Sequence, residues 1–323
     1  AAASALAVGL WALKPVFINT ISNSVGFVEA YLLAGAIAGA CSLLLLATVR
    51  PLRRVQLMSS FWVNAGLCGS MLAVWYYGFY RALYTTGAAE ATNVAFTWPL
   101  IAAIALPILV RGIPWLRGTQ WLFVVVAVAG GALVTMASTS SGSGDSNGIW
   151  WAVFAAFGSG LYLPFALRAA EGVQSKRPLV VTTWTISIAN IAACLLVAGM
   201  SIPTTGLSYS DLRWQTVLVC VVIGCGTYLS AEIAWTWAIG VSKSPKLGAL
   251  PYLSPAVSVI LLWLLFGEPL DWKVLVGLLV VVGANLGLHL AKGKPAEEPG
   301  TSARDRATPC LPPTAVSGRN SAP

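Results

Sequence analysis

The sequence predicts an all-α membrane protein whose ten transmembrane helices form two inverted five-helix repeats. The prediction rests on composition, on the spacing of apolar segments and on internal repetition. Of the 323 residues, 57% are hydrophobic and only 9% are charged, and the mean hydropathy is +0.78. A soluble domain of this size could not present so few charges to water without aggregating.

Ten apolar segments are each close to the length, about 20 residues, that crosses the hydrocarbon core of a bilayer. They are Ala3–Ile21, Val28–Val49, Ser60–Leu83, Ala88–Val110, Gln120–Met136, Ile149–Ala170, Val180–Met200, Trp214–Ile239, Leu247–Phe266 and Trp272–Leu290. Because every backbone polar group in lipid must be paired, we expect these segments to be helices. A membrane barrel would need short strands of alternating polarity, which the sequence does not show.

Short patterns recur in the same order in the two halves of the chain. Phe79–Leu83 (FYRAL) and Trp235–Ile239 (WTWAI) share one pattern. In each, an aromatic residue stands three positions before an alanine, and an aliphatic residue follows that alanine. Pro99 and Pro255 follow these two segments at the same distance. Two further pairs of similar segments are Leu13–Phe17 with Tyr162–Ala166, and Val124–Val134 with Leu278–Leu288. Internal duplication in an apolar chain is typical of membrane transporters.

Lysine and arginine lie mainly in alternate links between the segments. One side of the membrane has three, Arg81, Arg213 and Lys273. The other side has twelve, namely Arg50, Arg53, Arg54, Arg111, Arg117, Arg168, Lys176, Arg177, Lys243, Lys246, Lys292 and Lys294. The positive-inside rule therefore places both termini in the cytoplasm. Because each repeat has an odd number of helices, the second enters the membrane in the opposite direction, as in an inverted duplication.

The predicted domains follow from this organisation. The first repeat is residues 1–137 and the second is residues 149–292, joined by the polar, flexible and external linker Ser138–Gly148 (STSSGSGDSNG). Residues 293–323 are rich in proline and have no apolar run, so we expect a disordered cytoplasmic tail.

Composition also limits the partners and cofactors. The net charge of +8 indicates attraction to the anionic headgroups of the lipid bilayer rather than to nucleic acid. None of the six cysteines has a metal-ligand spacing, so the sequence predicts neither a disulfide nor a metal site. It has no glycine-rich phosphate loop, which argues against ATP as the energy source, and we expect no cofactor.

These patterns together resemble the EamA-type permeases of the drug/metabolite transporter superfamily over about residues 5–291. The resemblance is carried by the stretch from Phe79 to Pro99, by Leu253–Pro255, by Gly267–Leu270 (GEPL) before the last helix, and by Lys14 in the first helix. The first repeat departs from the family pattern, because Arg111–Pro114 (RGIP) stands where its own glycine-glutamate turn would be.

The resemblance implies a central cavity lined by helices one, three, four, six, eight and nine, with helices five and ten as outer supports. It also implies alternating access and, most often, export of small amphipathic metabolites such as amino acids across the bacterial inner membrane. A non-transporting receptor-like or structural membrane protein is the alternative. An intramembrane enzyme acting on lipids fits less well, because it would need clustered His, Asp or Cys residues and the chain has one histidine.

Lys14 and Glu232 are the only two charges well inside the predicted spans. A charge at the bilayer centre costs about 2.5 to 3.5 kcal/mol, so it is expected to face a cavity or a partner. As substrate-binding residues, Lys14 would attract a carboxylate and Glu232 an amine or a proton. A structural ion pair, or side chains that extend to the membrane surface, would also explain them. Their different predicted depths favour the substrate-binding interpretation.

Further polar and aromatic residues are candidates for substrate contacts. Asn93, in the fourth segment, could offer its amide to a substrate or bond a neighbouring helix. Deep aromatic residues could line the cavity and favour amphipathic organic substrates, or could be ordinary packing. They are Trp75, Tyr76, Tyr80, Trp98, Tyr162, Trp235 and Tyr252.

Matching prolines predict interruptions in equivalent helices of the two repeats. They are Pro15 and Pro164 in the first and sixth segments, and Pro99 and Pro255 in the fourth and ninth. In transporters such positions indicate hinges near the binding site, although a crowded bundle also tolerates prolines. Gly35–Gly39 and Gly283–Gly287 have the GxxxG spacing of closely packed helices and could form the seam of a homodimer.

Overall fold

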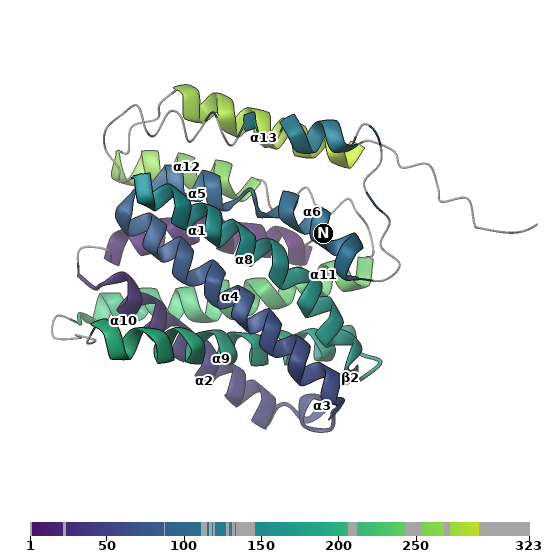
Figure 1. Ribbon diagram of the computed structural model, residues 1–323. Helices are drawn as coiled ribbons and strands as arrows, with labels where there is room; N and C mark the ends of the chain where they lie inside the picture. The colour runs from purple at the N-terminus through teal and green to yellow at the C-terminus, as the bar shows by residue number, and fades with distance from the viewer. Residues whose placement is uncertain are drawn as a thin grey trace, which may run out of the picture. The chain divides into compact units, whose positions relative to one another are not determined.

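The computed structural model describes residues 2–21, 24–86, 88–110, 120–126, 129–130, 146–205, 212–242, 253–267 and 272–290, and the single residues 115, 118 and 133. Its elements in chain order are α1 (Ala2–Ile21), α2 (Phe27–Thr48), α3 (Arg50–Arg53), β1 (Gln56–Leu57), α4 (Ser59–Thr85), α5 (Ala88–Ala95), α6 (Trp98–Leu109), α8 (Ser146–Glu171), β2 (Val173–Gln174), α9 (Pro178–Thr205), α10 (Trp214–Val221), η1 (Val222–Ala231), α11 (Glu232–Ser242), α12 (Leu253–Phe266) and α13 (Trp272–Leu290). The described chain is mostly helical, as predicted (Figure 1).

Five helical stretches are long and apolar enough to cross a membrane. They are Ala2–Ile21, Phe27–Thr48, Asn147–Glu171, Pro178–Ser201 and Trp214–Ile239. α4 has 27 residues but is not among them, because its tyrosines and Arg81 reduce its apolar character. The five stretches indicate a multi-pass membrane protein.

The fourth and eighth predicted segments are not single α-helices. α5 ends at Ala95 and α6 begins at Trp98, and Pro99 stands in the first turn of α6, where its missing N–H removes no helical hydrogen bond. The eighth segment passes from α10 through the ten residues of η1, a π-helix, into α11. The break before Pro99 agrees with the prediction, whereas no pattern in the sequence predicts the π-helical winding.

Pro15 and Pro164 do not interrupt their helices, contrary to expectation. α1 and α8 continue as single α-helices through Pro15 and Pro164, and α6 continues through Pro107. A proline removes one backbone hydrogen bond, and packing on both sides of it can keep a helix continuous. Pro255 lies two residues after Leu253, where the described part of α12 begins, so the predicted interruption of the ninth segment falls at the edge of the described residues.

Two glycines bring α4 and α8 together along their length (Figure 1). A Cβ atom at Gly78 of α4 would lie 3.0 Å from the carbonyl oxygen of Trp151, and one at Gly158 of α8 would lie 2.5 Å from the backbone nitrogen of Trp75. Any larger residue at either position would push the two helices apart. This close contact fixes the position of the aromatic residues of α4.

The Gly35–Gly39 motif packs within the chain. A Cβ atom at Gly35 would lie 3.1 Å from Sγ of Cys194, and one at Gly39 would lie 3.7 Å from Ile191. The motif therefore seats α9 against α2 and does not form a free homodimer seam. A Cβ atom at Gly283 would meet nothing within 4 Å.

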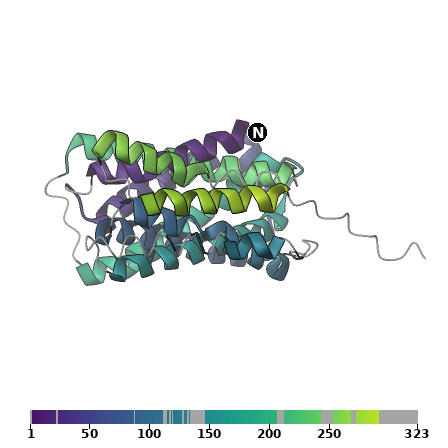
Figure 2. The same ribbon diagram turned by 90° about the horizontal axis from the view of Figure 1, so that it is seen from above.

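α13 lies outside the helices that hold the buried centre of the bundle (Figures 1 and 2). It contacts α12, and its Ala284 forms a small buried cluster with Leu100 and Val124. This is the position that the resemblance implies for a supporting helix.

The chain divides into two compact units, Ala1–Ala291 and Lys292–Pro323. The first unit holds both predicted repeats. The predicted tail lies outside the described residues. α8 begins at Ser146, so the last residues of the predicted linker are helical; the rest of the linker is also outside the described part of the chain.

Candidate functional site

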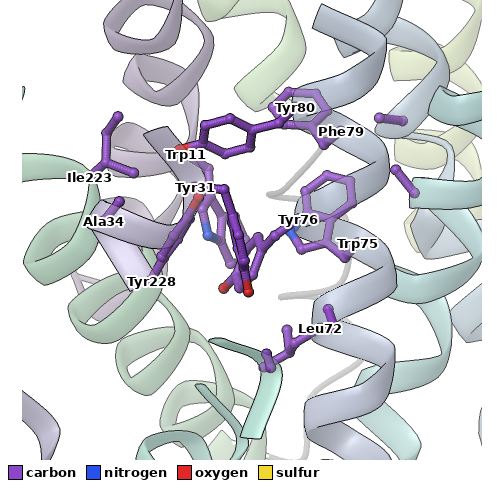
Figure 3. Packing of buried hydrophobic residues seen from close by; sticks show 14 of the residues in the cluster. Trp11, Tyr31, Ala34, Leu72, Trp75, Tyr76, Phe79, Tyr80, Ile223 and Tyr228 are labelled. Carbon is purple, nitrogen blue, oxygen red and sulfur yellow. The ribbon is translucent and has the colours of Figure 1, made fainter. Parts of the chain in front are cut away.

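A group of buried aromatic side chains fills the space between α1, α2, α4 and η1 (Figure 3). Tyr76 of α4 and Tyr228 of η1 stack with ring centroids 4.1 Å apart, and Tyr31 of α2 packs against both. We call this set the aromatic cluster; its members are Trp11, Tyr31, Trp75, Tyr76, Phe79, Tyr80, Tyr228 and Trp235. None is more than 7% exposed, so the cluster is closed in this structure.

The ammonium group of Lys14 lies inside the aromatic cluster. Its Nζ is 4.6 Å from the ring centroid of Tyr76, 4.7 Å from that of Phe79 and 4.8 Å from that of Trp75. Tyr228 adds a fourth ring at 5.3 Å. Aromatic faces attract a cation by about 2 kcal/mol where water is excluded. The four rings therefore replace part of the hydration that buried Lys14 has lost.

Glu232, the first residue of α11, brings a carboxylate to the same place. It is buried, and its Oε2 accepts a 2.8 Å hydrogen bond from the hydroxyl of Tyr162 on α8. Trp11 and Tyr76 also approach this carboxylate. Tyr76 thus lies next to both Lys14 and Glu232, although the sequence places these two charges at different depths. The long lysine side chain and the contact between α1 and α11 bring them to one cluster.

Lys14 and Glu232 stay separate within the aromatic cluster. Among the described residues they form no salt bridge within 4.0 Å, although each lies in the electrostatic field of the other. Each charge can therefore still bind a group of opposite sign. The described part of the chain holds no group of three or more His, Cys, Asp or Glu residues placed to bind a metal ion.

Several buried polar atoms of the aromatic cluster have no hydrogen-bond partner in the described chain. They are the hydroxyls of Tyr76, Tyr80 and Tyr228 and the indole nitrogen of Trp235. The hydroxyls of Tyr80 and Tyr228 approach each other without meeting the geometry of a hydrogen bond. An unpaired buried donor or acceptor costs about 1 to 3 kcal/mol. Four such atoms in one cluster could each gain a hydrogen-bond partner from a polar ligand.

The structure describes the side chains of some of the other predicted site residues but not of all. Trp98 of α6 lies edge-on to Trp11 with centroids 6.3 Å apart, so it borders the aromatic cluster. The side chains of Asn93 and Pro255, and all of Tyr252, lie outside the described part of the chain. The predicted residues that meet in or beside the cluster are Lys14, Tyr76, Tyr80, Trp98, Tyr162, Glu232 and Trp235.

Some members of the aromatic cluster were not candidates on sequence grounds. Trp11 precedes Lys14 by three residues, so helical spacing could identify it as a neighbour on one face of α1. Tyr228 precedes Glu232 by four residues, but η1 is π-helical, so α-helical spacing misplaces its side chain. Tyr31 comes from α2, a helix that the resemblance does not place in the cavity lining.

Asn190 of α9 fixes the backbone of η1. Its Nδ2 donates a 2.7 Å hydrogen bond to the carbonyl of Tyr228. In a π-helix each N–H donates to the carbonyl five residues earlier, and in an α-helix to the carbonyl four residues earlier. Where a π-helix changes to an α-helix, one carbonyl is therefore left without a backbone donor. Asn190 supplies a donor near this return. Its sequence context does not distinguish it from an ordinary polar link between helices.

Arg81 of α4 places a second cation beside the aromatic cluster. Its guanidinium carbon lies 5.0 Å from the ring centroid of Trp151 and 5.3 Å from that of Phe27. Its Nε is buried with no hydrogen-bond partner in the described chain. Since Arg81 follows Tyr80 directly, Arg81 and Lys14 bring two positive charges to this part of the bundle, beside the one negative charge of Glu232.

Part of the chain matches a known protein family, and its fold is similar to that of solved structures. Residues 146–288 match the model of the EamA-like transporter family. No match was found among curated proteins. Chains of solved structures also match, 24 in number. One is a crystal structure described only as that of a protein. It superposes on this chain with a TM-score of 0.62 at 22% sequence identity, and the match covers 90% of this chain and 98% of the other. At that identity the likeness concerns the fold alone.

The family match includes the half of the site that carries the carboxylate. Tyr162, Tyr228, Glu232 and Trp235 all fall within the matched residues. Residues 146–288 are therefore similar to the EamA-like transporter family, which is the EamA-type branch of the drug/metabolite transporter superfamily.

Proposed function

We propose that the protein is a secondary transporter that exports small amphipathic organic metabolites, such as amino acids, by alternating access. The observation that carries this proposal is the burial of Lys14 and Glu232 in one aromatic cluster, with no salt bridge between them in the described chain. A substrate with a carboxylate and an amine would pair with both charges. Its apolar part would contact the surrounding rings.

Contacts between helices support an inverted repeat of ten transmembrane helices. The repeat relates α1 to α8, α2 to α9, α4 to the stretch from α10 to α11, and α6 to α12. The contact of α4 with α8 corresponds to that of α11 with α1. The contact of α6 with α8 corresponds to that of α12 with α1. The contact of α4 with α9 corresponds to that of η1 with α2. A two-fold relation between repeats makes each such contact occur twice.

Substrate can reach the closed aromatic cluster only if helices move. Pro15 and Pro164 lie inside α1 and α8, Pro99 lies in the first turn of α6 and Pro255 lies in the described part of α12, so each pair occupies equivalent helices. A missing backbone hydrogen bond makes bending easier at an internal proline. We therefore assign these four positions, together with η1, as the hinges of alternating access.

The distribution of lysine and arginine supports an orientation with both termini in the cytoplasm. In a bacterial cell the inner membrane is the membrane where this rule acts on helical proteins. The substrate would then enter the aromatic cluster from the cytoplasmic side and leave on the opposite side.

Substrate exchange in proteoliposomes tests the proposed function. Vesicles loaded with one amino acid or amphipathic amine at a time are diluted into the labelled compound, and uptake is compared with that of protein-free vesicles. We expect counterflow of at least one compound, lost in Lys14→Ala and unchanged in Lys176→Ala, which removes an exposed lysine. Binding of a compound with no flux in any vesicle would instead identify a receptor-like protein and overturn the proposal.

A further inference from the structure

Three arginines line a pocket just after the end of α2, outside the aromatic cluster. Arg50, Arg53 and Arg54 surround a volume of about 190 Å3. All three side chains are exposed. By this measure of volume one water molecule needs only about 10 to 15 Å3, so the pocket has room for an anionic group.

The backbone that carries these arginines is held in place. Leu52, in the middle of α3, is buried in a small cluster with Leu46 of α2 and Val180 of α9. The indole nitrogen of Trp184 on α9 donates a 2.9 Å hydrogen bond to the Leu52 carbonyl. β1 then pairs with β2 through Gln56 and Gln174. The pocket is therefore built on a fixed turn and not on a freely moving link.

The charge of the pocket is not neutralised by the described chain. None of the three arginines forms a salt bridge within 4.0 Å there. β2, paired with β1, leads directly into exposed Lys176 and Arg177, which add two positive charges on this side. Glu171, exposed at the end of α8, is the one carboxylate in the same link. The balance in this region is strongly positive, which favours an anion.

The two helices that this turn contacts, α2 and α9, carry exposed apolar side chains. Leu43 and Leu44, in the last turns of α2, are 58% and 63% exposed, and Leu179 at the start of α9 is 52% exposed. α2 and α9 are both among the helices suited to cross the membrane. A lipid whose headgroup is held by the arginines would thus find apolar side chains for its acyl chains on both helices.

We propose that Arg50, Arg53 and Arg54 form a binding site for the phosphate of an anionic phospholipid. The planar guanidinium fork matches the oxygens of a phosphate, and three forks can each donate two hydrogen bonds to them. The acyl chains of the bound lipid lie along Leu43, Leu44 and Leu179. The lipid joins α2 to α9 at the membrane surface, on the face where the sequence places the cytoplasm.

Native mass spectrometry of the purified full chain tests this site. Detergent-solubilised protein is titrated with phosphatidylglycerol, with zwitterionic phosphatidylcholine and with inorganic phosphate. We expect one phosphatidylglycerol to bind more tightly than either other ligand. The triple variant Arg50→Gln, Arg53→Gln, Arg54→Gln should weaken that binding about tenfold or more, because each arginine contributes to attraction of the headgroup.

The control removes the same charge elsewhere. The variant Arg304→Gln, Arg306→Gln, Arg319→Gln loses three arginines of the C-terminal segment and should bind phosphatidylglycerol as the unmodified chain does. If the glutamine variant of the pocket does not fold, the triple Arg→Lys variant keeps the charge and loses the forks, and should bind several times more weakly. Equal phosphatidylglycerol binding by the pocket variant and the control would overturn the site. Inorganic phosphate binding as tightly as the lipid would overturn its assignment to a phospholipid.

Discussion

The side-chain amide of Asn190 on α9 holds the carbonyl of Tyr228 on η1 at 2.7 Å. The ring of Tyr228 stacks on Tyr76 and lies 5.3 Å from Nζ of Lys14. A helix that contributes no ring to the aromatic cluster therefore positions a ring inside it. Because the contact is to a π-helical segment, it connects the backbone of a proposed hinge to the geometry of the site.

The first prediction concerns this contact. Asn190→Ala should leave the Tyr228 carbonyl without its donor and lower the free energy of unfolding by about 1 to 3 kcal/mol. Affinity for substrate should also fall, because the Tyr228 ring is no longer fixed. Denaturant unfolding and a binding assay measure the two effects. Asn64→Ala is the control, since the Asn64 amide bonds the Ser60 carbonyl of its own helix at an exposed position. Equal losses in both variants would contradict the positioning role.

The second prediction separates a binding role of the buried charges from a structural one. Aromatic rings stabilise the Lys14 ammonium, and a hydrogen bond from Tyr162 stabilises the Glu232 carboxylate. Removing one of the two charges should therefore not leave the other without a stabilising contact. Lys14→Ala and Glu232→Gln should each express near normally and lose transport. A structural ion pair would behave differently: each single variant would lose about 3 to 5 kcal/mol of stability and the double variant would recover much of it. Thermal unfolding of the two single variants and the double variant distinguishes these outcomes.

The sequence predicts the helices of this fold better than it predicts how the site is assembled. Apolar length locates α1, α2, α8, α9 and α13 to within a few residues, because each is a long run with clear ends. The burial of Lys14 and Glu232 also follows from the cost of a charge in lipid. Tyr31 could not be found in this way, since nothing in α2 shows which face meets α4. The same holds for Tyr228, whose direction depends on a winding that no residue pattern signals.

The third prediction concerns orientation. Reporter fusions after Arg54 and after Lys294 should both be active on the cytoplasmic side, and a fusion within residues 138–145 should report the outer side. The residues of this linker carry no lysine or arginine, so a reporter there changes little of the charge bias. A cytoplasmic signal from the linker would show that the two halves do not enter the membrane in opposite directions.

The fourth prediction concerns the prolines inside equivalent helices. Replacing Pro15 and Pro164 together by alanine restores a backbone hydrogen bond in α1 and in α8 and makes both helices stiffer. Transport should slow more than substrate binding weakens, because the site is kept while its opening is impaired. Pro107→Ala is the control, since Pro107 also lies inside a helix but has no partner among the matching prolines. Unchanged flux in the double variant would remove both prolines from the mechanism.

The fifth prediction uses two free thiols as a probe of motion. Sγ of Cys41 on α2 and Sγ of Cys225 on η1 lie 3.2 Å apart, and both side chains are partly buried. A disulfide has an S–S distance of about 2.05 Å, so a small shift of either helix is enough to bring the two sulfur atoms into bonding distance. An added oxidant such as copper phenanthroline then removes two protons and two electrons from the two thiols, and the sulfur atoms form a disulfide bond. Mass spectrometry should find this bond within one chain, absent in Cys41→Ser and present in Cys194→Ser. If η1 is a hinge, the bond should stop transport until a reductant breaks it. A complete cross-link with undiminished flux would show that α2 and η1 do not separate during the transport cycle.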